Sequence, residues 1–209
     1  MSITDRISPP LQVSQWLNSP QPVTLDGLRG RVVVLHTFQM LCPGCVSHGL
    51  PQALHIHRLF PPDQVAVIGL HTVFEHHDVM SIEALRVFLH EYRIPFPVGV
   101  DQADPASPVP LTMQSYGLRG TPSVVVFDKG GRVRLNHFGQ IDDLQLGAVI
   151  GQLLAEVPAQ PPVDAGDSAA NQTDASACAG GVCAVHALPC AASPCATWPS
   201  RIWACSSRC

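Results

Sequence analysis

The feature that most constrains the fold of this sequence is a seven-residue strand-like run that two cysteines follow almost at once. The run Val32-Val33-Val34-Leu35-His36-Thr37-Phe38 is rich in β-branched residues and does not alternate, which is typical of a central strand buried on both faces. The motif Cys42-Pro43-Gly44-Cys45 begins four residues later, and proline is favourable at the start of a helix because its missing N–H has no partner there. The sequence therefore predicts a buried strand, a short loop and a helix that begins at the cysteine pair.

Strand-like and helix-like segments alternate beyond this unit. The expected strands cover residues 64–71, 96–101, 123–127 and 132–137, and the last two form a predicted β-hairpin around the Lys129-Gly130-Gly131 turn. The expected helices cover residues 43–60, residues 81–93, a short segment ending near residue 117, and a segment that begins at residue 142. This order predicts an α/β fold with helices on the faces of a central sheet.

Local signals support the helix boundaries. Ser81 is a suitable N-cap residue, and Asp142 and Asp143 favour a helix start through the positive end of the helix dipole. Pro51 lies inside the first helix and is expected to kink it.

The chain of 209 residues is long enough for one core with some sequence left over. We expect a folded domain over residues 1–157. Residues 158–209 are rich in Ala, Pro, Ser, Gly and Cys and lack periodicity, so a flexible tail is expected there. The tail contains six of the eight cysteines, and one of its thiols could reach Cys42 as a relay or regulatory partner.

Charge and hydropathy argue against several partner classes. Lys and Arg number 12 against 16 Asp and Glu, with no block of like charge, so neither a nucleic-acid partner nor a membrane partner is expected. The first twenty residues lack the apolar stretch of a signal peptide, and no run approaches the roughly 20 residues that cross a bilayer. A cytoplasmic location is the prediction.

Two cysteines at the mouth of a helix suit redox chemistry. The helix N-terminus stabilises a thiolate, and the second thiol lies near enough to resolve a mixed disulfide. Because the first cysteine of such a pair is the more exposed, Cys42 is the predicted nucleophile and Cys45 the predicted resolving residue. A zinc site and a pair of inert buried thiols remain as alternatives, although zinc needs two further ligands. We predict neither a metal nor a cofactor.

Two motifs together resemble the thioredoxin superfamily, in particular its redoxin and TlpA-like branch. They are the stretch from Arg31 through Leu41 to Cys45 and the stretch Tyr116-Gly117-Leu118-Arg119-Gly120-Thr121-Pro122-Ser123, and the likeness covers about residues 20–157. The resemblance implies a thioredoxin-like fold with a central mixed sheet, and an inserted strand-helix unit at residues 69–101. It also implies a thiol–disulfide oxidoreductase whose partners are a disulfide-bearing protein or small molecule and a thiol reductant.

The resemblance implies roles for residues around the cysteines. Thr121-Pro122 falls where the family carries a cis-proline, whose neighbour offers strand-like hydrogen bonds to a substrate chain, whereas an ordinary trans proline is the alternative. The residues expected to contact the substrate are Leu41, Pro43, Gly44, Thr121 and Pro122. Leu41 replaces the usual tryptophan, and the order Pro-Gly replaces Gly-Pro, which leaves the redox potential open.

His36 lies six residues before Cys42, where thioredoxins have a buried acidic residue. It is expected to take the proton of Cys45 during resolution, with a pKa suited to neutral pH. A hydrogen-bonded core histidine is the competing interpretation. His55, His57, His76 and His77 are interpreted as surface histidines, since His55 and His57 point to different faces of a helix.

Two other functions compete with disulfide exchange. A peroxiredoxin would reduce hydroperoxides through a sulfenic acid on Cys42, but its Pro-x-x-x-Thr-x-x-Cys motif is absent, since Leu35 and Gln39 stand at the proline and threonine positions. A redox sensor or binding module would use the edge beside Pro122 without turnover.

Overall fold

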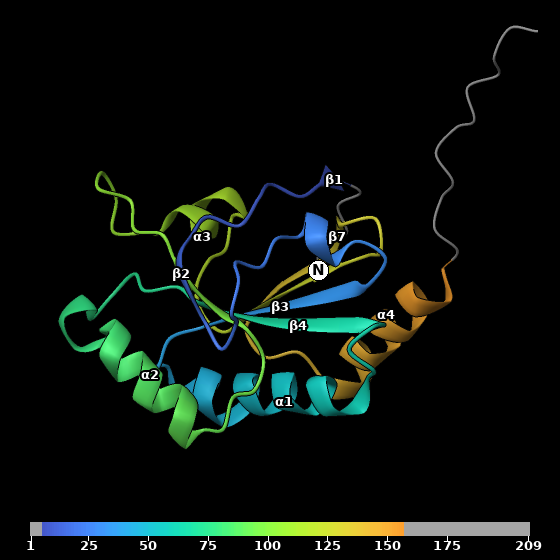
Figure 1. Cartoon of the computed structure of the whole chain (residues 1–209), viewed down its shortest axis with the longest axis horizontal. Helices are drawn as coiled ribbons and strands as arrows, with labels where there is room; N and C mark the ends of the chain where they lie inside the picture. The colour runs from blue at the N-terminus through green and yellow to red at the C-terminus, as the bar shows by residue number, and fades with distance from the viewer. Residues whose placement is uncertain (1–5, 157–209) are drawn as a thin grey trace, which may run out of the picture. The chain divides into compact units, whose positions relative to one another are not determined.

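The computed structural model describes residues 6–156, and Figure 1 shows a single mixed sheet with helices on both faces. The seven strands lie in the order β1-β7-β6-β3-β4-β5-β2. Their bounds are Arg6–Ile7 (β1), Val13–Leu17 (β2), Val32–Phe38 (β3), Val65–His71 (β4), Val98–Asp101 (β5), Ser123–Phe127 (β6) and Arg132–Phe138 (β7). The predicted tail lies outside the described residues.

Strand β3 lies at the centre of the sheet, with three strands on each side, and every one of its residues is buried. It pairs in parallel with β4 and antiparallel with β6, so that His36 lies between Gly69 and Val124. The predicted hairpin of β6 and β7 is present and antiparallel. The prediction of a continuous, doubly buried strand leading to the cysteines is confirmed.

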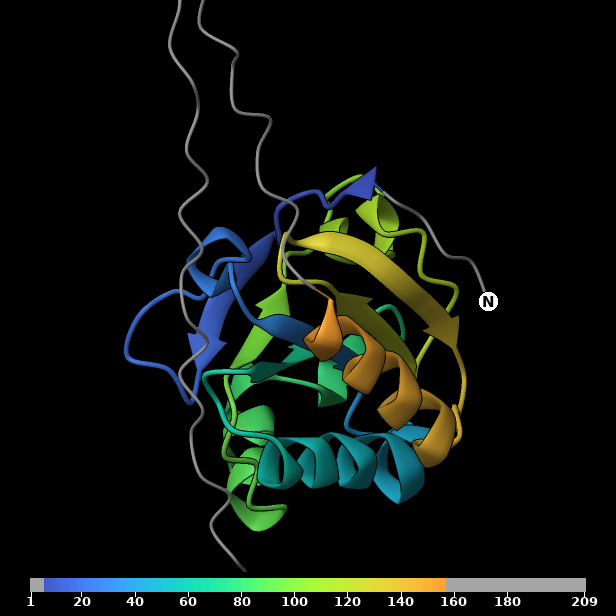
Figure 2. The same cartoon turned by 90° about the vertical axis from the view of Figure 1, so that its right-hand side faces the viewer.

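Helices cover both faces of the sheet. The α-helices are α1 (Leu50–Leu59), α2 (Ile82–Glu91), α3 (Leu111–Ser115) and α4 (Asp143–Ala155). The short helices are a π-helix, η2 (Cys45–Gly49), and two 3₁₀ helices, η1 (Asp26–Leu28) and η3 (His77–Val79). Buried residues of α1, α2 and α4 share one core with Val32, Val34 and Phe38, and Figure 2 shows α1 and α4 side by side beneath the sheet.

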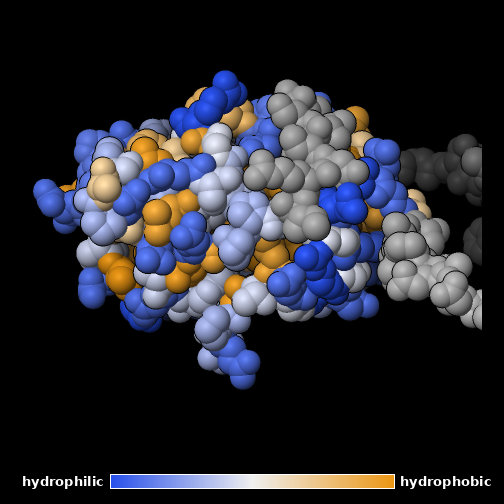
Figure 3. Space-filling view, turned by 90° about the horizontal axis from the view of Figure 1, so that it is seen from above, coloured by the Kyte–Doolittle hydropathy of each residue, from blue (hydrophilic) through white to orange (hydrophobic). Residues whose placement is uncertain are grey.

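A second core lies on the opposite face. Val33 and Leu35 of β3 pack there with Met113 of α3 and with Tyr116 and Leu118. Successive side chains of β3 therefore serve alternate cores, which explains why its sequence shows no polar alternation. On the face drawn in Figure 3, hydrophobic patches are separated by hydrophilic residues.

The helix that carries the cysteines changes its winding ahead of Pro51. Residues 45–49 form the π-helix η2, and α1 continues from Leu50 with Pro51 in its first turn. Proline has no N–H to donate to the preceding turn, so a local change of hydrogen bonding is expected there. The expected distortion therefore takes the form of a π turn.

The N-terminal strands are the main feature that the sequence pattern did not predict. Strand β2 pairs antiparallel with β5 at one edge of the sheet, and β1 pairs with β7 at the other. Strand β2 contains polar Ser14 and Gln15 and an irregular register near them, so it shows neither clean alternation nor a continuous apolar run. The N-cap predicted at Ser81 is confirmed, since its side chain accepts the Ala84 N–H. The helix start predicted at Asp142 and Asp143 is also confirmed, and Asp142 itself caps the helix by accepting the N–H groups of Leu144 and Gln145. Within residues 6–156, no helix combines the length and the apolar character needed to span a bilayer.

The buried carboxylate of Asp101 fastens α3 to the sheet. Its oxygens accept the Thr72 hydroxyl at 2.8 Å and the backbone N–H groups of Thr112 at 2.9 Å and Met113 at 3.1 Å. Burial raises the pKa of this carboxyl, against the opposing effect of the hydrogen bonds. Asp101 thus joins the end of β5 to the start of α3.

Replacing Asp101 with Asn should weaken this junction. An amide nitrogen would face the Met113 N–H or the Thr112 N–H, donor against donor, so the free energy of unfolding should fall by about 1–3 kcal/mol. Urea titration followed by circular dichroism measures the change. Asp63→Asn, at an exposed position, is the matched control and should stay within about 0.5 kcal/mol of wild type. Equal effects of the two variants would contradict the role assigned to Asp101.

Candidate active site

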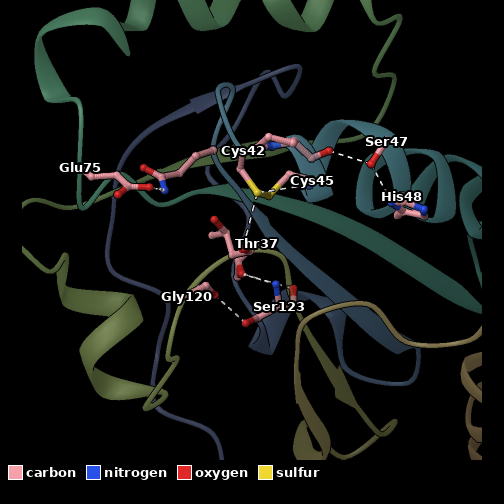
Figure 4. Close-up of a disulfide and its surroundings, with 11 residues drawn as sticks. Thr37, Cys42, Cys45, Ser47, His48, Glu75, Gly120 and Ser123 are labelled. Carbon is pink, nitrogen blue, oxygen red and sulfur yellow. Dashed lines mark hydrogen bonds between the residues drawn. A yellow bond between two sulfur atoms is a disulfide. The ribbon is translucent and has the colours of Figure 1, made fainter.

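Cys42 and Cys45 form a disulfide between the end of β3 and the start of the helix, as Figure 4 shows. Their Cα atoms lie 5.2 Å apart. Cys42 is half-buried, whereas Cys45 is fully buried in the core beneath. The backbone N–H of Cys45 points at the Cys42 sulfur, with the two atoms 3.2 Å apart. This geometry provides one accessible sulfur next to a helix N–H group, and one sheltered sulfur.

The Thr121–Pro122 peptide bond beside the disulfide is cis, as the resemblance implies. The carbonyl oxygen of Thr121 lies 3.5 Å from the Cys42 sulfur. Ser123 anchors the segment from behind, since its hydroxyl donates to the Gly120 carbonyl at 2.7 Å and its N–H donates to the Thr37 hydroxyl at 3.2 Å. Buried β3 therefore positions both the cysteine pair and the loop that faces it (Figure 4).

A groove of about 470 Å³ opens in front of Cys42, and we call it the front groove. It is lined by Leu41, Cys42, Pro43, Phe74, Glu75, His76, Met80, Gly120, Thr121 and Phe138. Leu41 and Phe138 are large apolar side chains that remain 58% and 44% exposed, which leaves apolar surface open beside the reactive sulfur. Of the five residues predicted to contact substrate, Leu41, Pro43 and Thr121 line this groove, while Gly44 and Pro122 do not.

Gly44 and Pro122 lie close to each other. A Cβ atom placed on Gly44 would lie 3.4 Å from the Pro122 ring, an ordinary contact distance. Pro122 also lines a second cavity of about 300 Å³, bounded by His36, Ser47, His48, Gly49, Pro51, Gln52, His55, Pro122 and residues 139–143. We call it the rear cavity.

His36 lies fully buried at the inner end of the rear cavity. Burial lowers its pKa to about 4, because the charged imidazolium would be removed from water without a compensating charge. The expected pKa near neutrality is therefore wrong: the imidazole is uncharged at pH 7. The competing picture of a hydrogen-bonded core histidine does not fit either, because its buried Nδ1 has no hydrogen-bond partner among the described residues.

The other histidines have diverse surroundings. His57 packs edge-on against Phe96, with ring centroids 5.8 Å apart, and His76 lines the front groove. His55 is exposed and lines the rear cavity. Within residues 6–156, no group of three or more ligating side chains could hold a metal ion.

Several residues of the front groove were not predicted as site residues. Phe74, Glu75 and Met80 come from the segment after β4, and Phe138 comes from the end of β7. They approach Cys42 only through the folding of the sheet, so local spacing carries no signal for them. The segment that contains Phe74 and Glu75 belongs to the expected inserted unit, which was the one available pointer.

The curated proteins that resemble this chain are distant relatives. No family model matches the sequence. Protein DipZ of Mycobacterium bovis and that of Mycobacterium tuberculosis are each 26% identical over 144 residues, or 68% of this chain. Those residues are 20% of each DipZ protein, so the chain spans about a fifth of the length of the curated relatives it matches.

Solved structures decide the family. The crystal structure of a thioredoxin-like superfamily protein is 52% identical to this chain with a TM-score of 0.71, and the match covers 75% of this chain and 99% of that one. The chain belongs to the thioredoxin-like superfamily. This thioredoxin-like protein is also similar to a thiol-disulfide isomerase from Corynebacterium glutamicum, at 53% identity and a TM-score of 0.69, over 70% of this chain and 95% of that one. The predicted fold and resemblance are confirmed.

The contact between His36 and the helix makes Gly49 sensitive to substitution. A Cβ atom on Gly49 would lie 2.5 Å from the His36 ring and 3.3 Å from Pro122. Gly49→Ala should therefore lower the free energy of unfolding by about 1–3 kcal/mol through overpacking. Gly147→Ala on α4 is the matched control, because its Cβ meets no atom within 4 Å and should raise stability by up to about 1 kcal/mol. Denaturant titration of both variants tests the contrast, and a stabilising Gly49→Ala would refute it.

Two buried imidazoles predict a dependence of stability on pH. Burial lowers the pKa of both His36 and His71 from 6.5 to about 4. Because the unfolded chain then binds protons more readily, stability is complete above pH 6.5 and falls as the pH drops toward 4. Between pH 7.5 and pH 5 each imidazole should remove about 2 kcal/mol of unfolding free energy.

His71→Leu isolates the contribution of one imidazole. Urea unfolding measures the loss of unfolding free energy between pH 7.5 and pH 5. In this variant the loss should be about 2 kcal/mol smaller than in wild type. His90→Leu, which removes an exposed histidine from α2, should leave the wild-type fall intact. An unchanged fall in His71→Leu would show that His71 is not kept neutral by burial.

Proposed function

We propose that this thioredoxin-like protein is a thiol–disulfide oxidoreductase in which Cys42 attacks the substrate disulfide and Cys45 resolves the product. The observation that carries the proposal is the asymmetry of the pair: Cys42 borders the front groove, whereas Cys45 is wholly buried behind it. The 53% identical relative, a thiol-disulfide isomerase, supports the same class of enzyme.

The reaction begins with both cysteines reduced. The Cys42 thiolate, facing the Cys45 N–H, attacks one sulfur of a substrate disulfide, and the other substrate sulfur leaves as a thiolate that takes a proton from water. Cys45 then loses its proton and attacks the Cys42 sulfur, which releases the first substrate sulfur as a second thiol. The enzyme ends with the Cys42–Cys45 disulfide, and a dithiol reductant returns it to the reduced state by the reverse exchange.

His36 enters the proposal as a short-lived proton carrier for Cys45. Its neutral imidazole can accept a proton, but a pKa of about 4 means that the proton must pass on at once. The rear cavity, which reaches His36, offers space for the water that would receive it.

The substrate lies in the front groove in this proposal. Thr121 would pair with the substrate backbone, and Pro122, which lacks an N–H, leaves that position open. Leu41, Pro43 and Gly44 would shape the surface around the reacting sulfur. The substrate in this proposal is a disulfide of a protein or of a small molecule, and the reductant is a separate thiol. The cytoplasmic location stays a prediction.

The peroxidase alternative gains no support from the geometry of the site. Gln39, which stands at the threonine position of the peroxiredoxin motif, is buried and donates its amide N–H to Glu75 at 3.4 Å. It offers no hydroxyl to orient a peroxide.

Single-cysteine variants test the roles of Cys42 as nucleophile and Cys45 as resolving residue. Cys42→Ser should abolish dithiothreitol-driven reduction of insulin, whereas Cys45→Ser should accumulate a mixed disulfide with insulin that non-reducing electrophoresis detects. Hydrogen peroxide consumption, measured on the same wild-type sample, should remain slow. An active Cys42→Ser chain would overturn the assignment of the nucleophile, and rapid peroxide consumption would favour the peroxidase alternative.

A further inference from the structure

We infer that Glu75 selects the substrate: the front groove favours a disulfide in an extended segment that carries a Lys or Arg beside the attacked cysteine. This inference rests on the proposed function and adds the chemical character of the substrate. It makes Glu75 a specificity-determining residue outside the Cys42-Pro43-Gly44-Cys45 motif.

The charge of the front groove is one-sided. Glu75 is the one carboxylate among the described residues that line it, and no Lys or Arg lines it with them. None of the ion pairs within residues 6–156 involves Glu75. Because the side chain is exposed at the groove, its negative charge is available to a bound chain.

Two hydrogen bonds fix Glu75 relative to the reactive sulfur. The buried Gln39 donates its side-chain amide N–H to the Glu75 carboxylate at 3.4 Å, and its backbone carbonyl accepts the Cys42 N–H at 3.2 Å. Figure 4 shows Glu75 on the same side of the helix start as Cys42. A buried residue therefore links the carboxylate directly to the backbone of the nucleophile.

The backbone next to Glu75 is held in one conformation. His76 adopts the left-handed conformation, with φ 54° and ψ 38°, and its carbonyl accepts the Val79 N–H at 3.2 Å to start the short helix η3. A non-glycine residue in this region costs roughly 1 kcal/mol, so the rest of the fold must hold it there. The turn sets the direction in which Glu75 leaves the chain, and His76 itself lines the groove.

Apolar side chains complete the recognition surface. Phe74, Met80 and Phe138 provide the apolar wall, and the Arg119 guanidinium lies 5.3 Å from the centroid of the Phe138 ring. Arg119 does not line the groove, and its guanidinium packs on the Phe138 ring; among residues 6–156 it forms no ion pair with Glu75. An extended segment beside Thr121 would thus place an apolar side chain on this wall and a cationic side chain at Glu75.

Two matched peptides test the inference. Each carries one cysteine in a mixed disulfide with 2-mercaptoethanol and an apolar neighbour, and they differ only in a Lys or a Glu at the other flank of the cysteine. The reduced full chain is mixed with each peptide at low ionic strength, and quenched samples are analysed by mass spectrometry. Parallel reactions of Cys42→Ser measure exchange at the remaining cysteines, which is subtracted.

The readout is the ratio of the two rate constants, Lys peptide to Glu peptide. This ratio cancels any general effect of a substitution on the reactivity of Cys42. We expect the Lys peptide to react about two- to fivefold faster, the range for an exposed ion pair, and the ratio to shrink at high salt. Glu75→Gln should lower the ratio, whereas Glu91→Gln, which removes an exposed carboxylate from α2, should keep it. A ratio of one in wild type, or an unchanged ratio in Glu75→Gln, overturns the inference and leaves the proposed function standing. No Cys42-dependent reaction with either peptide overturns the proposed function itself.

Discussion

The complete burial of β3 is the constraint on which the rest of the site depends. All seven residues of this strand are enclosed, with alternate side chains in two separate cores, so the strand cannot shift without disturbing both. The chain leaves β3 at Phe38 and reaches Cys42 within four residues, which gives the first cysteine little freedom. Hydrogen bonds between Thr37 and Ser123, one donated by each residue, tie the cis-proline segment to the same strand. Both halves of the site are therefore positioned by one element.

Burial also gives different chemical properties to residues of the same type. The two cysteines are separated by two residues, yet one meets the groove and the other belongs to the core. The ten histidines share one ordinary pKa, yet His36 and His71 are held neutral by removal from water. Glu75 is the opposite case, because its side chain is exposed and gives the front groove a negative charge.

The parts of the structure that could be predicted from sequence are those encoded locally. The seven-residue run of β3, the N-cap at Ser81, the helix start at Asp142 and the hairpin turn at Gly130 each carry their own signal, and all are present. Strand β2 carries no such signal, because its pairing with β5 decides its conformation. The pKa of His36 depends on how deeply the sheet is covered, and Glu75 reaches Cys42 through Gln39, so both depend on tertiary structure that no spacing in the sequence encodes.

The placement of β1 and β2 has a consequence for how this protein meets extended chains. A sheet edge offers unpaired backbone groups to any strand, and short or irregular edge strands reduce that tendency. Here the two outermost strands both come from the N-terminal part of the chain, and β2 has a break in its register where it pairs with β5. Among the described residues, the rim formed by β2 therefore offers no uninterrupted ladder. Under the proposed function, an extended chain would then pair at Thr121, beside the Cys42 sulfur, and not along this rim.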